Sequence, residues 1–264
     1  MKVYISVDME GICGTTSWSE VTKGNDDYEA GRRQMTAETV AACMGAKKAG
    51  ATDIVVRDAH DSGRNIIADE LPEDVTLIRG WSHHPYCMMQ GLDRTFDASL
   101  MIGYHSYAGG EGNPLSHTMN NIHNSSVVIN GKLASEFLIN YYISLLEKVP
   151  VIFVSGDQEI CYHAREYAPD MTAVAVKSGA GDSTVNLHPK QALKSIEEGA
   201  QKALTDIPGA AQLPDHFDVT LNYNNHKDAY KASFYPGAKL SEARAVSFSS
   251  NDYFEVLRFF LFTF

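Results

Sequence analysis

The order of the predicted strands and helices in the first sixty residues limits the possible folds more than any other feature of this sequence. Residues 3–7 form a mostly apolar run, which breaks at Gly11. Apolar residues recur at helical spacing over 26–49, and the glycine that follows, Gly50, is typical of a helix C-terminus. Residues 53–57 form a second apolar run. This order of strand, helix and strand predicts a right-handed βαβ unit with parallel strands.

Similar segments continue along the chain. Further strands are expected near residues 75–79, 98–103, 127–129, 151–154, 217–223 and 244–248, and helices over 133–146, 158–167, 190–204 and from about 252. The predicted fold is α/β, with a mainly parallel sheet, flanking helices and a smaller C-terminal α/β portion. Prolines at both ends of 208–214 indicate a connector. We therefore expect a core over residues 1–208 that carries the site, and a C-terminal portion over 209–264 packed on it, either as a second lobe or as an edge of the same sheet.

Composition narrows the class of protein. The 264 residues carry a formal net charge of -11, which argues against nucleic acid as a partner because phosphate binding needs clustered Lys and Arg. The sequence shows no secretion signal and no apolar run of about 18 residues, so we expect no membrane partner. The four cysteines are scattered without a CxxC pair, which favours a reducing cytoplasm. The apolar run 259–262 is expected to be a buried terminal helix or an oligomer contact.

Acidic and imidazole side chains follow several predicted strands. They are Asp8 with Glu10, Asp58 with His60, His105, and Asp157. Because ligands of open α/β sheets bind beyond the carboxyl ends of parallel strands, these side chains are expected to converge. If the first strand continues, Asp8 and Glu10 point the same way, and two such carboxylates repel unless one is protonated or a cation bridges them. A mixture of carboxylate and imidazole favours zinc, manganese, iron or cobalt over calcium or magnesium.

Each of these residues also has a structural interpretation. Asp8 could cap the turn at Gly11, and His60 and His105 could be ordinary loop histidines. His117 follows a glycine-rich loop, where it could act as a general base, a general acid or an oxyanion stabiliser. Glu136 lies near the start of an apolar helix, where it suits the helix dipole or could reach a metal ion. Other residues are weaker candidates, and the pair His83-His84 is expected at the rim of the site.

The ordered motifs resemble those of a known family. The run Ser6-Val7-Asp8-Met9-Glu10-Gly11-Ile12 is similar to the opening motif of the D-aminopeptidases of peptidase family M55. Later motifs match in order, namely Asp58-Ala59-His60, Gly103-Tyr104-His105, Ser116-His117, and Asn130-Gly131 with Glu136 and Asn140. The resemblance covers about residues 1–210 and weakens after that, and Ser135 stands where the family usually has glycine.

The resemblance implies a two-zinc aminopeptidase that acts on short peptides with an N-terminal D-amino acid, such as D-Ala-D-Ala. By matching positions, the zinc ligands would be Asp8, Glu10, His60, His105 and Glu136, with Asp8 as the bridge between the ions. His117 would take part in catalysis, and the chains would form a ring-like homo-oligomer that encloses the active sites. The substrate-binding residues remain unknown at this point.

Other functions stay open on the residues alone. The same cluster could serve a dinuclear metallohydrolase for another small amide or ester, since metal ions assist several hydrolytic reactions. A peptide-binding or metal-binding protein without turnover is a second alternative. A nucleotide-dependent enzyme is a third, although the glycine-rich segment 109–112 lacks the Lys-Ser/Thr that completes a phosphate loop.

Overall fold

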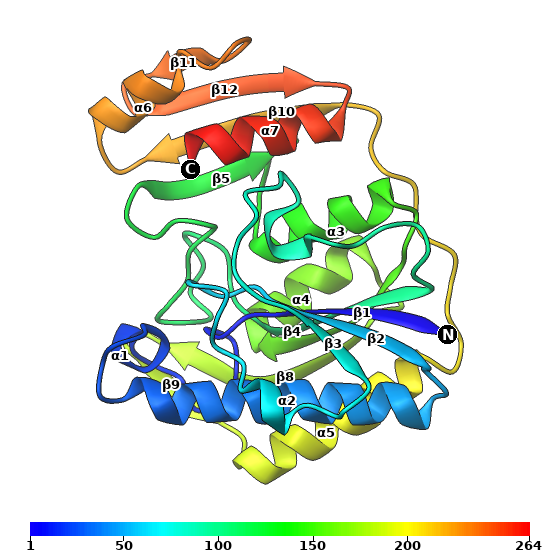
Figure 1. Ribbon diagram of the computed structural model, residues 1–264. Coiled ribbons are helices and arrows are strands. Elements are labelled where there is room, and N and C mark those ends of the chain that lie inside the picture. Colours follow the sequence, from blue (N-terminus) through cyan, green and yellow to red (C-terminus); the bar gives the residue numbers. More distant parts are fainter.

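The computed structural model describes residues 1–264 and contains two β-sheets with helices packed on and between them (Figure 1). The first sheet has the spatial order β3 (Val75–Ile78), β2 (Asp53–Asp58), β1 (Lys2–Val7), β4 (Ala98–Tyr104), β7 (Val151–Asp157), β8 (Thr172–Ala180) and β9 (Ser183–Asn186). Its neighbouring strands are parallel except for β8 and β9, which pair antiparallel. The second sheet is antiparallel, in the order β11 (Lys239–Glu242), β12 (Ala245–Ser250), β10 (Phe217–Tyr223), β5 (Asn124–Ile129) and β6 (Lys132–Leu133).

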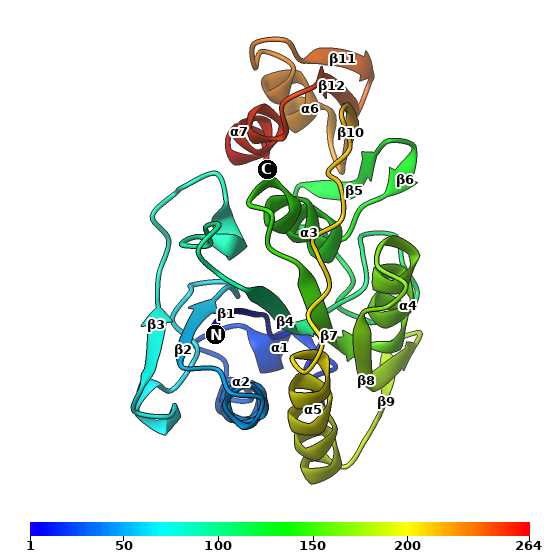
Figure 2. The same ribbon diagram turned by 90° about the vertical axis from the view of Figure 1, so that its right-hand side faces the viewer.

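Helices pack on both faces of the first sheet, and others pack on the second sheet. They are α1 (Trp18–Val21), α2 (Tyr28–Lys48), α3 (Glu136–Leu146), α4 (Gln158–Tyr167), α5 (Pro189–Ala203), α6 (His226–Ala232) and α7 (Tyr253–Thr263), with short 3-10 turns η1 (Ala68–Glu70) and η2 (Cys87–Met89). In Figure 2, α2 and α5 lie side by side below the sheet, whereas α3 lies above it and carries α7 and the second sheet. This arrangement confirms the predicted α/β class with a mainly parallel sheet and flanking helices. None of the helices combines the length and apolar character needed to cross a membrane.

Strand β1 shows why the opening apolar run predicted a sheet covered on both sides. Val3, Ile5 and Val7 are fully buried in the core formed with α2 and α5. Tyr4, between them, is fully buried in the other core, which contains α3, α7 and the inner side of the second sheet. Alternate side chains of a strand point to opposite faces, so a strand with apolar cover on both faces is apolar throughout.

Several element boundaries differ from the sequence prediction. Helix α3 begins at Glu136 and not at residue 133, because Asn130 and Gly131 adopt positive φ angles of 52° and 79° in a tight turn. This turn returns Lys132–Leu133 along β5 as β6. Strands β8, β9 and β11 and helix α6 are additional elements that the apolar pattern did not predict.

The C-terminal portion contributes strands to the second sheet and does not extend the edge of the first one. Its strand β10 pairs with β5, with Val219 opposite Ile129, so the second sheet takes strands from both sides of residue 208. A long connector from α5 to β10 runs along the side of the molecule between the two layers (Figure 2). The division into 1–208 and 209–264 stays a prediction.

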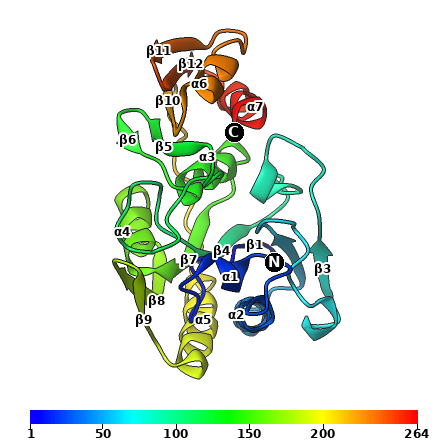
Figure 3. The same cartoon turned by 90° about the vertical axis from the view of Figure 1, so that its left-hand side faces the viewer.

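The strand order of the first sheet reverses next to β1. The chain proceeds outwards from β1 to β2 and β3, returns to β4 on the other side of β1, and then continues outwards to β7 and β8. Ligand sites of open α/β sheets lie at such a switch point, beyond the carboxyl ends of the strands. Figure 3 looks towards these ends, with β3 near one edge of the sheet and β9 at the other.

Candidate metal centre

Two glycines allow the ends of β1 and β4 to approach each other closely. The Gly11 N–H donates to the carbonyl oxygen of Gly103 over 2.8 Å. A β-carbon on Gly11 would lie 1.7 Å from a carbonyl oxygen of β4, and one on Gly103 would lie 2.3 Å from the carbonyl oxygen of Asp8. Only glycine fits such a close backbone contact. The contact places Asp8, just after β1, beside His105, just after β4.

His60 joins the carboxylates that follow β1. Its Nδ1 lies 2.9 Å from Glu10 Oε2 and 3.3 Å from Asp8 Oδ1. The opposite nitrogen, Nε2, donates to the carbonyl oxygen of Val21 over 2.7 Å, which leaves Nδ1 free to act as an acceptor or ligand. Because β1 ends at Val7, strand alternation does not bring Asp8 and Glu10 together as predicted; the turn after the strand does.

His105 lies between Glu136 and the other carboxylate oxygen of Asp8. His105 Nε2 is 3.4 Å from Asp8 Oδ2 and 3.4 Å from Glu136 Oε2. His105 Nδ1 donates to the carbonyl oxygen of Ser106 over 2.9 Å, so Nε2 faces the cluster. Glu136 is the first residue of α3, and Ser135 caps that helix through its Oγ. Serine is a favourable N-cap, so its replacement of the usual family glycine suits this position.

His117 lies over this group, nearer to solvent. Its ring stacks on that of His105 with a centroid distance of 4.3 Å and an interplanar angle of 12°. Its Nε2 is 3.4 Å from Glu136 Oε1 and 4.0 Å from Glu10 Oε1, while Nδ1 donates to the carbonyl oxygen of Leu115. The His117 side chain is 12% exposed, against 0% for His105. All six predicted site residues therefore lie together, with His117 at the open side.

The buried charges perturb one another strongly. Burial and the neighbouring Glu10 carboxylate raise the pKa of Asp8 to about 8. Burial also acts to raise the pKa of Glu10, but His60 and then His117 outweigh it and hold that pKa well below its usual value. Burial acts to lower the pKa of His105, but Glu136 and then Asp8 raise it to about 10. Burial likewise acts to lower the pKa of His60, but the carboxylates raise it well above its usual value. The carboxylates thus hold protons on His60 and His105, and a cation bound there would replace those protons.

The cluster fits a divalent metal ion on its own geometry. Asp8 Oδ2, Glu10 Oε2 and His105 Nε2 are buried and make no hydrogen bond, which is costly for polar atoms. The donor atoms form three sets, and within each set all atoms lie within 4.8 Å of one another. The sets are Asp8–Glu10–His60, Asp8–His105–Glu136 and Glu10–His105–His117. Buried carboxylate and imidazole donors in such sets suit a first-row transition ion. Asp8 belongs to two of the sets through different oxygens.

Asp58 and Asp157, which also follow strands, do not join the cluster. The Asp58 carboxylate accepts the backbone N–H of Asn65 and of the next residue, over 2.5 Å and 2.7 Å, and so holds the loop after β2. Asp157 caps α4 by accepting the N–H of Ile160. Backbone donors use both carboxylates, so the expectation that every acid after a strand faces the site was wrong for these two.

The sequence analysis did not predict the roles of two residues that hold the Glu10 loop. The buried ammonium of Lys177 donates to the carbonyl oxygens of Glu10 and Thr15 over 2.5 Å and 2.6 Å. The Asn113 side chain donates to the same Glu10 carbonyl over 2.9 Å. Burial lowers the pKa of Lys177 to about 8. Neither residue has a local signal, because its partners are more than a hundred positions away.

The cluster opens into a cavity of about 720 Å³. Trp18 forms one wall and meets the His117 ring edge-on, with the centroids 5.4 Å apart. His83 lines this cavity, whereas its neighbour His84 packs against Tyr86 outside it. A cavity of this size could take a short peptide beside the metal ligands.

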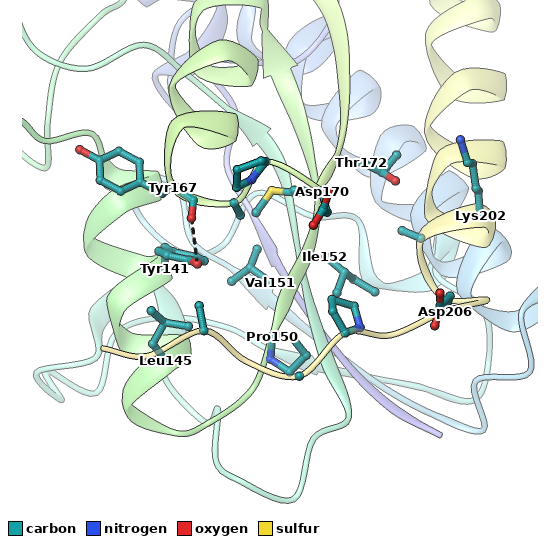
Figure 4. A pocket seen from close by; sticks show the side chains of 17 residues that line it. Tyr141, Leu145, Pro150, Val151, Ile152, Tyr167, Asp170, Thr172, Lys202 and Asp206 are labelled. Carbon is teal, nitrogen blue, oxygen red and sulfur yellow. Dashed lines mark hydrogen bonds between the residues drawn. The ribbon is translucent and has the colours of Figure 1, made fainter. Parts of the chain in front are cut away.

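A separate cavity of about 270 Å³ lies at the opposite, amino-terminal ends of β7 and β8 (Figure 4). Its walls include Tyr141, Pro150, Lys202 and Asp206, and the connector after α5 runs across it. It contains none of the carboxylate and imidazole groups described above. The cavity at the carboxyl ends is therefore the candidate active site.

Comparison with known proteins places this site in a family. The model of the family Peptidase_M55, described as D-aminopeptidase, matches residues 1–262. The D-aminopeptidase of Bacillus subtilis (strain 168) is 33% identical over 259 residues, which cover 97% of this chain and 93% of that protein. A solved structure described as the Zn-dependent D-aminopeptidase DppA from Bacillus subtilis, a self-compartmentalizing protease, is 31% identical with a TM-score of 0.92. That match covers 99% of this chain and 96% of the other.

These matches make the protein a hydrolase that acts on peptide bonds. Since the family model spans nearly all of it, the chain belongs to the D-aminopeptidase family M55. The match reaches residue 262, so the resemblance extends beyond the 210 residues that carry the motifs. The C-terminal portion is part of the family fold.

Proposed function

We propose that this protein is a zinc-dependent aminopeptidase that releases N-terminal D-amino acids from short peptides. The observation that carries the proposal is the position of Asp8, which presents Oδ1 to His60 and Oδ2 to His105. One zinc ion would be held by Asp8, Glu10 and His60, and a second by Asp8, His105 and Glu136. The zinc dependence of the similar solved protein supports this choice of metal.

Bound zinc ions would acidify a water molecule and polarise the carbonyl of the scissile peptide bond. Asp8, Glu10 and Glu136 would serve as ligands of these ions, and a bound ion would also hold the free amino group of a peptide N-terminus. An enzyme that binds this amino group beside the reacting carbonyl cuts after the first residue.

His117 is placed to move a proton or stabilise the oxyanion. Its Nδ1 is held by the carbonyl oxygen of Leu115, so Nε2 faces the carboxylates of Glu10 and Glu136 from the open side. From there Nε2 can donate a hydrogen bond to the carbonyl oxygen or a proton to the leaving amine.

We also propose a ring-like homo-oligomer in the cytoplasm. The description of the similar structure as a self-compartmentalizing protease supports assembly of several chains. All four cysteines are free thiols, and three of them are buried, which suits a reducing compartment.

Hydrolysis of D-Ala-D-Ala and L-Ala-L-Ala, before and after chelation and after zinc is added back, tests the activity. We expect the D-peptide to be cleaved faster, activity to be lost on chelation and zinc to restore it. Zinc-dependent cleavage without preference for the D-peptide would reject the stereospecificity and leave the metal site standing. Cleavage that survives complete removal of metal would reject the metal mechanism.

A further inference from the structure

An apolar pocket of about 190 Å³ adjoins the active-site cavity. The two share Cys87 and Met119 in their walls, so the pocket lies next to the cavity that holds the metal ligands. Helix α3 connects them: its first residue, Glu136, lies in the cluster, and Asn140, one turn later, lines the pocket. Nothing in the mechanism above uses this space.

Met119 stands between the cluster and the pocket. Its backbone N–H donates to Glu136 Oε1 over 2.7 Å, so this mouth residue is tied to a proposed metal ligand. Met119 also has a φ of 65°, and Cys87, the other shared residue, has a φ of 45°. Positive φ is unfavourable for side chains of this size, and such strain tends to gather at functional sites. The mouth of the pocket is therefore held in a defined and costly backbone shape.

Helix α7 forms the outer wall of the pocket. Leu257, Phe260, Leu261 and Phe264 line it, at the spacing of one helix face. Leu257 and Phe260 are 2% and 4% exposed, whereas Leu261 is 36% exposed at the outside. An apolar cavity of about 150 Å³ can hold a benzene ring, so this pocket has room for a large aliphatic or aromatic side chain.

We propose that the pocket receives the side chain of the substrate's N-terminal residue, and that the preferred substrates begin with a large apolar D-residue such as D-Leu or D-Phe. This inference rests on the proposed aminopeptidase function. Hydrolysis requires the scissile carbonyl beside the metal ligands, which places the preceding α-carbon near Glu136, and Met119, which lines the pocket, is hydrogen-bonded to Glu136. The methyl group of D-Ala would leave most of the pocket unfilled.

Steady-state hydrolysis of D-Ala-D-Ala, D-Leu-D-Ala and D-Ala-D-Leu tests the pocket. One methylene in an apolar enzyme pocket changes kcat/KM by about tenfold or more, so D-Leu-D-Ala should exceed D-Ala-D-Ala by at least about tenfold. D-Ala-D-Leu should show no such gain, because its large side chain follows the scissile bond.

Filling the pocket supplies a second test. Leu261→Trp adds bulk at the outer, partly exposed wall, and should bring the kcat/KM ratio of D-Leu-D-Ala to D-Ala-D-Ala down to about one. Leu240→Trp is the matched control, since Leu240 is 40% exposed on β11 and does not line this pocket. The ratio of two substrates in one preparation does not depend on how much of a variant folds.

Each contrary result has a distinct meaning. Equal or faster cleavage of D-Ala-D-Ala by the wild type would overturn the pocket assignment but leave the aminopeptidase intact. A ratio that Leu261→Trp does not change, or an equal loss on both peptides with a smaller particle mass, would also overturn it. Failure to cleave any of the three D-peptides would overturn the proposed function and the pocket with it.

Discussion

At the scale of single residues, the site depends on which nitrogen of each histidine is held by a backbone carbonyl. In His60, Nε2 donates to the carbonyl oxygen of Val21. In His105 and His117, Nδ1 donates instead, to the carbonyl oxygens of Ser106 and Leu115. The remaining nitrogens all face the carboxylates. Such outer contacts fix the tautomer and orientation of metal-binding histidines.

His117→Ala should separate catalysis from metal binding. Because its Nε2 lies on the open side of the cluster, we expect the variant to keep its zinc while kcat falls about 10²- to 10⁴-fold. Metal analysis and steady-state kinetics on the same preparation check this, with His216→Ala on the second sheet as a control. A loss of zinc in proportion to the loss of activity would make His117 a metal ligand instead.

The sequence predicted which side chains gather here, but not the role of every acid. Ordered motifs identified Asp8, Glu10, His60, His105, His117 and Glu136. Asp157 looked equivalent, although its place just before a helix was a recognisable capping signal. Lys177 could not be found this way, because its contacts with Glu10 and Thr15 exist only once β8 lies near the turn after β1.

At the scale of elements, a buried acid links α2 to the loop that follows β1. Glu38 Oε1 accepts the Cys13 N–H and the Gln34 side chain, each over 2.9 Å, while Oε2 has no partner. Burial raises the pKa of Glu38 from 4.5 to about 7. This helix therefore packs on the motif loop through a carboxyl group that is easily protonated.

Glu38 should make stability fall as pH rises. Between pH 4.5 and about 7 the folded protein keeps a proton that the unfolded chain has released, so Glu38 lowers the free energy of unfolding, by up to about 3 kcal/mol at pH 7 and above. Urea unfolding of wild type and Glu38→Gln across this range measures the difference, with Glu29→Gln on the same helix as the control. The free energy of unfolding of Glu38→Gln should rise relative to that of the wild type as pH rises. A difference that does not change with pH would refute the raised pKa of Glu38.

The pattern of apolar residues predicted the strands of the first sheet better than those of the second. β1, β2, β4 and β7 are apolar runs because helices cover both of their faces. β8 and β11 are mixed in character and partly exposed, so they carry no such signal. The pairing of β10 with β5 joins segments about ninety residues apart, which no local pattern encodes.

At the scale of the whole molecule, aromatic side chains are exposed on the outer layer, which consists of the second sheet with α6 and α7. Tyr230 and Phe234 of this layer pack edge to face but are 53% and 70% exposed, and Phe262 is 68% exposed. Exposed apolar groups gathered in this way indicate a contact with another chain. The proposed ring offers such a contact.

Light scattering should therefore give a particle mass several times the 29.0 kDa of one chain. Phe234→Glu should reduce that mass, because a carboxylate would have to be buried at the contact. Lys227→Glu, on helix α6 just before Phe234, controls for the added negative charge. A wild-type particle of about 29 kDa would contradict the assembly.

The central claim is a pair of zinc ions joined by Asp8, and metal analysis of wild type beside Asp8→Asn tests it most directly. Asparagine keeps the size of the side chain but removes the charge and one of the two acceptor oxygens that face His60 and His105. We predict about two zinc ions per chain in the wild type and fewer than about one in the variant. Full zinc content in Asp8→Asn, or no zinc in the wild type, would contradict the account.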